Sequence, residues 1–114
     1  MSIQKVLIKN SFKEISDKIN TAYDNHILDS INDHCLRIAI MQGEYRWHYH
    51  QNTDELFIVL EGELKIEIKD KDTVFLKPGQ FIKIPCKTIH KTSAATRTVN
   101  LCFEKNADDT IFVD

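Results

Sequence analysis

The sequence predicts an all-β protein, a sandwich or barrel of many short strands, with one short helix near its N-terminus. Apolar and polar residues alternate in several short runs, for example in 64–69, where Leu64, Ile66 and Ile68 alternate with charged residues. Alternation of this kind has the period of a half-buried strand. Gly, Pro and Asp residues separate the runs at close spacing, which is typical of sandwiches and barrels.

The N-terminal part of the chain predicts an edge strand followed by a helix. Residues 2–9 alternate apolar and polar positions and are expected to pair at the edge of the sheet. Ser11, with Glu14 three residues later, forms a capping box, which favours a helix that starts directly after the serine. We therefore expect a helix near 12–20, with apolar side chains on one face.

A hairpin is predicted next. Its arms are 25–31 and 34–41, joined at Asn32-Asp33. Asn and Asp tolerate the positive φ that tight turns require. In the second arm Leu and Ile occupy every second position from 36 to 40, which again indicates a half-buried strand.

The rest of the chain predicts further strands, and some of them are apolar on both faces. In 55–60 every residue after Glu55 is apolar, so Phe57 faces one side and Ile58 the other. A sheet that buries one face shows polar residues on the other. We therefore expect the N-terminal helix or a second subunit to cover the second face. The strands expected after the hairpin are 45–50, 55–60, 63–69, 73–76, 80–84, 88–92 and 97–104. The tail is expected either to end as a short strand through Ile111 and Val113 or to be loose.

Composition and charge limit the classes of protein to which the chain can belong. The chain has 114 residues, of which 42% are hydrophobic, and a formal charge of −2 from 15 basic and 17 acidic residues. This balance gives no sign of a surface for nucleic acid or membrane. No run has the length of a signal peptide or a membrane span, and three cysteines without close pairing fit a reducing compartment. We expect one cytoplasmic domain, 1–114, that takes a small-molecule ligand.

Two histidines one residue apart begin a candidate metal site. Side chains at i and i+2 of a strand share a face, so His48 and His50 present two imidazoles side by side. Glu55 begins the next predicted strand, with Asp54 as the competing carboxylate, and His90 follows a later run punctuated by Pro and Gly. Imidazole with carboxylate suits divalent Fe, Mn, Ni, Cu or Zn. We predict one such metal, held by His48, His50, Glu55 and His90.

The residues around the histidine pair resemble the first motif of the cupin family. That motif reads glycine, five residues, His-x-His, three or four residues, Glu, six residues and Gly. Here Gly43 is followed by four residues instead of five, and the remainder fits through His48, His50, Glu55 and Gly62.

The second cupin motif is matched in part. It reads glycine, five residues, Pro-x-Gly, two residues, His, three residues and Asn. Gly79, Pro85 and His90 fit, whereas Lys87 stands at the second glycine and Ala94 at the asparagine. Because glycine permits a positive φ at such a position, the lysine predicts an altered turn before His90.

The resemblance implies a double-stranded β-helix, or jelly-roll barrel, with the short N-terminal helix outside it. It also implies a two-fold homodimer, which is common in this family. The four metal ligands would lie in the mouth of the barrel and leave open coordination positions, as catalytic sites do. One fold hosts many functions, so the reaction does not follow from the resemblance.

Two functional hypotheses follow for the site. The first is a metal-dependent enzyme of dioxygenase, isomerase or decarboxylase type, acting on a small anionic molecule because three imidazoles and one carboxylate leave a divalent ion with net positive charge. Arg46, on the face of the two strand histidines, and Phe57, in the apolar wall, are the predicted substrate contacts. The second is a non-catalytic binding or sensing protein, with or without metal. The sequence shows no clear general base besides the ligands, which weakens the enzyme hypothesis.

Overall fold

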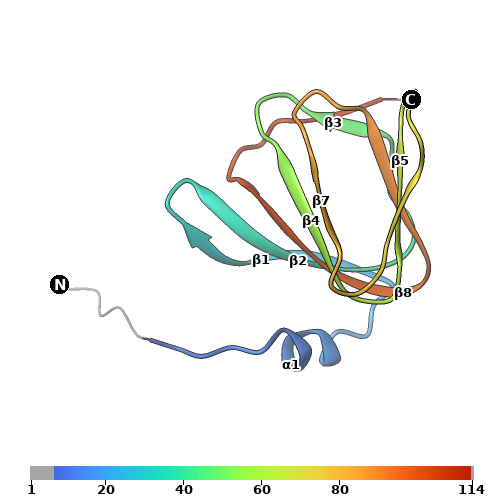
Figure 1. The fold of residues 1–114 in the computed structure, drawn as a ribbon. Coiled ribbons are helices and arrows are strands. Elements are labelled where there is room, and N and C mark those ends of the chain that lie inside the picture. Colours follow the sequence, from blue (N-terminus) through green and yellow to red (C-terminus); the bar gives the residue numbers. More distant parts are fainter. Residues whose placement is uncertain (1–6, 114) are drawn as a thin grey trace.

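The computed structural model describes residues 7–113, and within them nine antiparallel strands form one sheet that curls into an open barrel, with one short helix outside it (Figure 1). This confirms the predicted all-β fold with a minor helix. The described chain contains no helix long and apolar enough to cross a membrane. The elements in chain order are α1 (Phe12–Asp17), β1 (Tyr23–Ile31), β2 (His34–Glu44), β3 (His48–His50), β4 (Glu55–Glu61), β5 (Leu64–Ile68), β6 (Val74–Leu76), β7 (Phe81–Ile84), β8 (His90–Lys105) and β9 (Thr110–Phe112).

The helix begins where its cap predicts but is shorter than expected. The Ser11 hydroxyl accepts a hydrogen bond from the backbone N–H of Glu14 at 3.3 Å, and the helix ends at Asp17 with Lys18 as its C-cap. The chain must then turn into β1, which leaves no room for a helix to residue 20. Most of the edge strand expected over 2–9 lies outside the described residues, and 7–9 form no strand.

The predicted hairpin is confirmed. β1 pairs with β2 in antiparallel register from Tyr23 opposite Met41 to Ile31 opposite His34. Asn32 adopts a φ of 55° in the connecting turn, as its position between the two arms predicts.

The two strands predicted at 88–92 and 97–104 are in fact one strand of 16 residues, β8. The residues between them, Ser-Ala-Ala-Thr at 93–96, include neither Gly nor Pro, so nothing in the backbone interrupts the strand. β8 bends instead, and register shifts in the facing strands β2 and β4 accompany the bend. Its N-terminal part pairs with β5 and its C-terminal part with β2 and β4, so β8 joins the sheet together.

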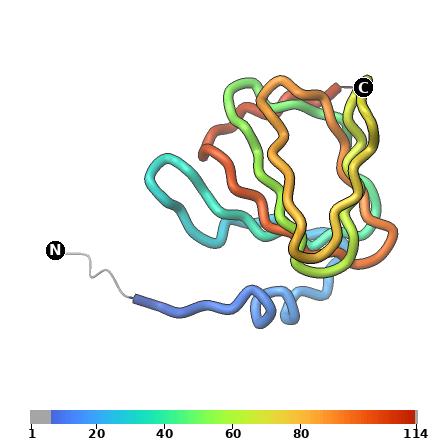
Figure 2. Tube along the Cα trace, viewed as in Figure 1, coloured from blue at the N-terminus to red at the C-terminus, as the bar shows by residue number. Residues whose placement is uncertain are grey.

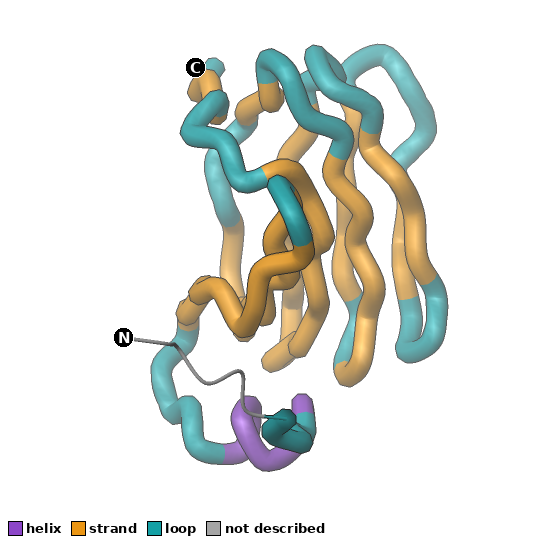
Figure 3. The backbone as a smooth tube through the Cα atoms, turned by 90° about the vertical axis from the view of Figure 1, so that its left-hand side faces the viewer, coloured by secondary structure: helices purple, strands orange, loops and turns teal. Residues whose placement is uncertain are grey.

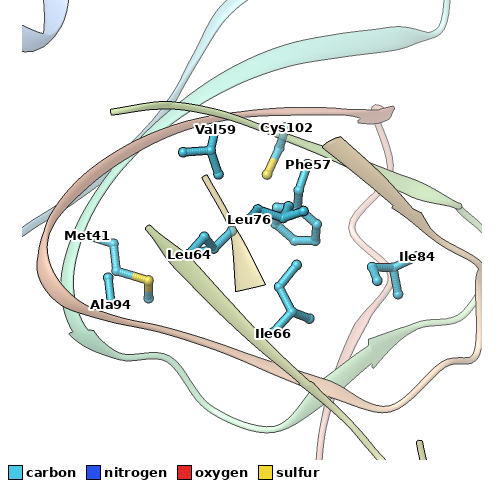
Figure 4. Packing of buried hydrophobic residues seen from close by; sticks show 9 residues of the cluster. All are labelled: Met41, Phe57, Val59, Leu64, Ile66, Leu76, Ile84, Ala94 and Cys102. Atoms are coloured by element: carbon cyan, nitrogen blue, oxygen red, sulfur yellow. The ribbon is translucent and has the colours of Figure 1, made fainter. Parts of the chain in front are cut away.

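Apolar side chains pack on both faces of the curled sheet. Side chains from six strands project toward one another inside the barrel and form the inner cluster (Figure 4): Met41, Phe57, Val59, Leu64, Ile66, Leu76, Ile84, Ala94 and Cys102. On the opposite face Ile38, Ile40, Val99 and Leu101 form the outer cluster. Ile15 and Ile19, in and just after α1, pack against this outer cluster. The N-terminal helix therefore covers part of the second face, as expected.

The two ends of the barrel differ. α1 lies at one end, whereas β3 and the loops before β4 and β8 lie at the other, as the trace of Figure 2 shows. The rotated view of Figure 3 also shows the helix beyond one end of the strands. The histidine motif is therefore placed at the barrel end remote from the helix.

Candidate metal centre

Three strands bring the four predicted ligands together. His48 and His50 lie on β3, Glu55 is the first residue of β4 and His90 is the first residue of β8, directly opposite His48 in the register. One ligand atom from each of the four lies within 4.8 Å of all the others. The side chains of His48, Glu55 and His90 are buried and that of His50 is half-buried. These residues form a group that could bind a metal ion.

Backbone and carboxylate groups orient the histidine rings. The Nδ1 atoms of His48 and His90 lie 2.8 Å from the carbonyl oxygens of Arg46 and Thr88, to which they donate hydrogen bonds. That tautomer leaves each Nε2 lone pair directed at the cluster. Nδ1 of His50 lies 3.1 Å from Oδ1 of Asp109, an arrangement often seen behind metal-bound histidines.

The atoms at the centre of the cluster lack hydrogen bonds, and their arrangement tests whether these residues fit a cation. Glu55 Oε1 lies 3.2 Å from His50 Nε2 and 3.5 Å from His90 Nε2, at the distances of ion pairs. All three atoms are buried without a hydrogen-bond partner among the described residues. An unmet buried polar atom costs about 1–3 kcal/mol. A divalent cation between two imidazole nitrogens and a carboxylate oxygen would satisfy all three, so the residues fit a metal.

The electrostatics of the metal-free cluster favour a charged pair. Burial alone would raise the pKa of Glu55, but the neighbouring His50 and His90 outweigh it and hold that pKa well below its usual range. Burial lowers the pKa of His50, yet the Glu55 carboxylate outweighs it and raises the value to about 9. Burial also lowers the pKa of His48, which keeps that imidazole neutral and available as a ligand.

The turn before His90 keeps its shape despite the lysine. Lys87 itself adopts a φ of +65°, the left-handed conformation that glycine would take, and its N–H donates to the carbonyl of His50 at 2.7 Å. The altered turn expected from the lysine is therefore absent, and the substitution is accommodated as local backbone strain. Asp54, the competing carboxylate, accepts a hydrogen bond from the N–H of Cys86 at 2.9 Å and lies outside the cluster.

A cavity of about 510 Å³ adjoins the cluster inside the barrel. His48, His50 and Glu55 line it, and so does Phe57. The exposed Arg46 lies outside this lining, with its guanidinium 4.1 Å from the centre of the Phe112 ring. Substrate contact by Phe57 and by Arg46 stays a prediction.

Sequence reasoning missed a second carboxyl group beside the cluster. Glu104 on β8 is the direct cross-strand partner of Glu55 on β4, so both side chains lie on the inner face. Burial and the charge of Glu55 raise the pKa of Glu104 to about 7. Its Oε2 is buried without a hydrogen-bond partner among the described residues. A carboxyl group with such a pKa can give or take a proton, which the ligand residues alone do not offer.

Sequence reasoning also overlooked Arg37. The alternation in β2 indicated which residues share a face, but the apolar Ile38 and Ile40 belong to the outer cluster. The residues that alternate with these on β2 line the cavity, and they are Arg37, Ala39 and Met41. Of these three residues only Arg37 is polar, and no local signal marks its face as the interior of a barrel.

Comparisons with known proteins identify a matching domain family and a similar protein. The cupin domain profile matches residues 37–103, more than half of the chain. The uncharacterized protein YdbB of Bacillus subtilis is 45% identical over 100 residues, which make up 88% of each protein.

Solved structures of similar fold extend the comparison. A cupin-2 domain containing protein from Shewanella frigidimarina has a TM-score of 0.80 at 29% identity, with 85% of this chain and 94% of that chain covered. A putative sugar phosphate isomerase from Acidithiobacillus ferrooxidans has a TM-score of 0.69 at 19% identity, with 90% and 77% covered. At the lower identity the likeness concerns the fold alone.

Proposed function

Because the chain belongs to the cupin domain family, we propose that it binds one divalent transition metal through His48, His50, Glu55 and His90 and acts as a metal-dependent enzyme on a small anionic molecule. The reaction type is that of a dioxygenase, an isomerase or a decarboxylase. The metal is Fe, Mn, Ni, Cu or Zn, the ions that imidazole and carboxylate ligands suit.

The observation that carries the proposal is a set of buried, converging ligand atoms whose contacts with one another are ion pairs and not hydrogen bonds. His50 Nε2, His90 Nε2 and Glu55 Oε1 converge within 4.8 Å and have no hydrogen bond among the described residues. Folding tolerates such a set poorly unless something else satisfies it. The backbone carbonyls and Asp109 behind the rings fix which nitrogen faces the centre, as expected for ligands prepared for a cation.

A cavity beside the cluster supports an enzyme over a purely structural metal site. A bound metal would supply Lewis-acid polarisation of a substrate oxygen or activation of a bound water. The chain supplies the surroundings: Phe57 and Met41 form part of an apolar wall that excludes water, and Glu104 can hold a proton at its free Oε2. A divalent ion held by one carboxylate and three neutral imidazoles would give the site a net positive charge. This charge favours binding of an anionic molecule.

Elemental analysis of protein purified without a metal-binding tag tests metal binding. We expect about one metal per chain in the wild type and almost none in a His48→Ala/His50→Ala double variant. A His26→Ala/His34→Ala double variant is the matched control, because these two histidines contact their neighbours Asp24 and Asp33 and lie outside the cluster. A wild type that stays empty after incubation with each of the five ions would refute the metal proposal.

A second experiment separates catalysis from binding alone. Metal-loaded protein is incubated under air with a panel of small oxo acids, hydroxy acids and sugar phosphates, and each is followed by proton NMR. Conversion that requires the intact cluster supports the enzyme. Saturable binding without conversion of any compound would favour the alternative, a non-catalytic binding or sensing cupin.

A further inference from the structure

The cavity beside the metal-site residues contains a single strongly basic side chain among the described residues that line it. This residue is Arg37 of β2, and no other Arg or Lys contributes to the lining. Two carboxyl groups, Glu55 and Glu104, lie deeper in the same cavity, and Asp108 is exposed at its rim. An anionic ligand that enters the cavity therefore meets only one permanent positive charge provided by the protein.

Two hydrogen bonds hold the Arg37 side chain in place. Its Nε donates to Oε1 of Glu104 at 3.1 Å, and its Nη1 donates to Oδ1 of Asn25 at 3.2 Å. Asn25 also lines the cavity. None of the described residues accepts a hydrogen bond from Nη2. The side chain is 31% exposed, so the guanidinium is oriented by the protein but still open to a ligand.

We propose that Arg37 binds the carboxylate of a small carboxylic acid whose other end reaches the cluster of His48, His50, Glu55 and His90. This inference rests on the proposed function and narrows its substrate class from anions to carboxylic acids. The planar guanidinium matches a carboxylate with two parallel N–H donors, which a lysine would not do. Its remaining donors, on Nη2 and the second hydrogen of Nη1, are those that a ligand can use.

The position of Arg37 relative to the cluster sets the size of the molecule. Arg37 contacts Glu104, and Glu104 is the cross-strand partner of Glu55, so one carboxyl group separates the arginine from the metal-site residues. A molecule that spans this interval has a short carbon chain. Asn25, Asn100 and Asn106, which also line the cavity, supply neutral amides for any hydroxyl or oxo groups between its two ends.

The competing account is that Arg37 only neutralises Glu104. An ion pair that serves the fold needs both partners but gives the cavity no preference for a charged ligand. The two accounts therefore differ in one measurable quantity, the affinity for a dicarboxylate relative to its monoamide, which has the same shape and one charge less.

The experiment measures this preference by calorimetry, with malonate, succinate and glutarate, each against its monoamide. It uses metal-loaded and metal-free wild type, Arg37→Gln, Arg37→Lys, Arg46→Gln and the double variant Arg37→Gln/Glu104→Gln. Lys83→Gln is the control for net charge, because Lys83 is exposed and lies outside the cavity lining. The double variant removes both members of the ion pair, so it is expected to fold even if Arg37→Gln leaves Glu104 too poorly paired.

We expect the wild type to prefer at least one dicarboxylate over its monoamide by about 10- to 100-fold, the range of a charge-assisted hydrogen bond. Arg37→Gln and the double variant lose that preference, Arg37→Lys keeps part of it and Lys83→Gln keeps all of it. No preference in wild type for any pair, or a preference that survives Arg37→Gln, overturns the inference. An effect of Arg46→Gln in place of Arg37→Gln also overturns it.

Metal content, measured in every sample, separates this inference from the proposed function. Arg37 contacts none of the four ligand residues, so Arg37→Gln should bind as much metal as wild type. If the protein never takes up metal, the proposed function is refuted. The proposed role of Arg37 is then still tested by whether the metal-free protein prefers a dicarboxylate over its monoamide.

Discussion

Replacing Gly62 by alanine should destabilise the protein far more than the same change at Gly79. Both glycines have a left-handed backbone, with φ of +81° and +85°. A Cβ atom at Gly62 would lie 2.4 Å from the Thr98 hydroxyl oxygen and 2.6 Å from the carbonyl oxygen of Arg97, whereas one at Gly79 would meet no atom within 4 Å. Both variants carry the same backbone strain, so the difference between them measures the cost of the steric contact of the new methyl group with Thr98 and Arg97.

The magnitude follows from what the new methyl group displaces. Either alanine costs about 1–2 kcal/mol for an L-residue in the left-handed region. At Gly62 the methyl also displaces the Thr98 hydroxyl, which accepts from the N–H of Glu63 at 3.1 Å and is fully buried. The loss of about 1 kcal/mol for that bond and of about 1–3 kcal/mol for overpacking adds about 2–4 kcal/mol.

Thermal and urea unfolding followed by circular dichroism measure the difference. At this chain length about 1 kcal/mol corresponds to roughly 4 °C in Tm, so Gly62→Ala should melt about 8–16 °C below Gly79→Ala. Equal Tm values for the two variants would refute the reasoning, because they would mean that β4 and β8 do not approach each other closely at this turn.

Four further predictions concern the site and the assembly. Lys87→Gly should raise the free energy of unfolding by about 0.5–1 kcal/mol in urea titrations, since relief of left-handed strain exceeds the added chain entropy. Asp109→Asn should weaken metal binding about 10- to 100-fold in competition with a chelator, while the exposed Asp108→Asn leaves it unchanged. The pKa of His50 is raised from 6.5 to about 9, so its proton stabilises the metal-free protein fully below pH 6.5 and progressively less as the pH rises through 9. Metal uptake at pH 7 should therefore release about one proton from His50. Calorimetry in buffers of different ionisation enthalpy measures this release. The expected homodimer stays a prediction, and light scattering after size exclusion should give twice the chain mass of 13.3 kDa, whereas a single-chain mass would contradict it.

Much of the fold could be predicted from local patterns. The capping box at Ser11 and the turn at Asn32 each depend on a few neighbouring residues, and both occur in the structure as expected. The convergence of His48, His50, Glu55 and His90 was predictable because two motifs with a fixed separation identified it. The cap and the turn are each signalled within one segment, and the metal-site group is signalled within two short motifs.

What could not be predicted depends on contacts between distant segments. The partnership of Glu104 with Glu55 requires the register of β4 against β8, and the place of Arg37 requires knowing which face of β2 turns inward. Apolar residues on both faces of the sheet make that choice ambiguous, because the outer cluster is as regular in sequence as the inner one. The break predicted between 92 and 97 was wrong for a related reason, since a bent strand and two separate strands share the same alternation.

The central place of β8 has a consequence for the order in which the protein can form during synthesis. β2, β4 and β5 all pair with β8, which is the second-last strand of the chain. Until the ribosome has released residues 90–105, these earlier strands lack the neighbour that aligns them, and His90 is not yet available to complete the metal-site group. Folding of the barrel should therefore wait for β8 and be slow for its size, as is usual where most pairings are distant in sequence. Metal uptake through all four residues would then follow synthesis of β8.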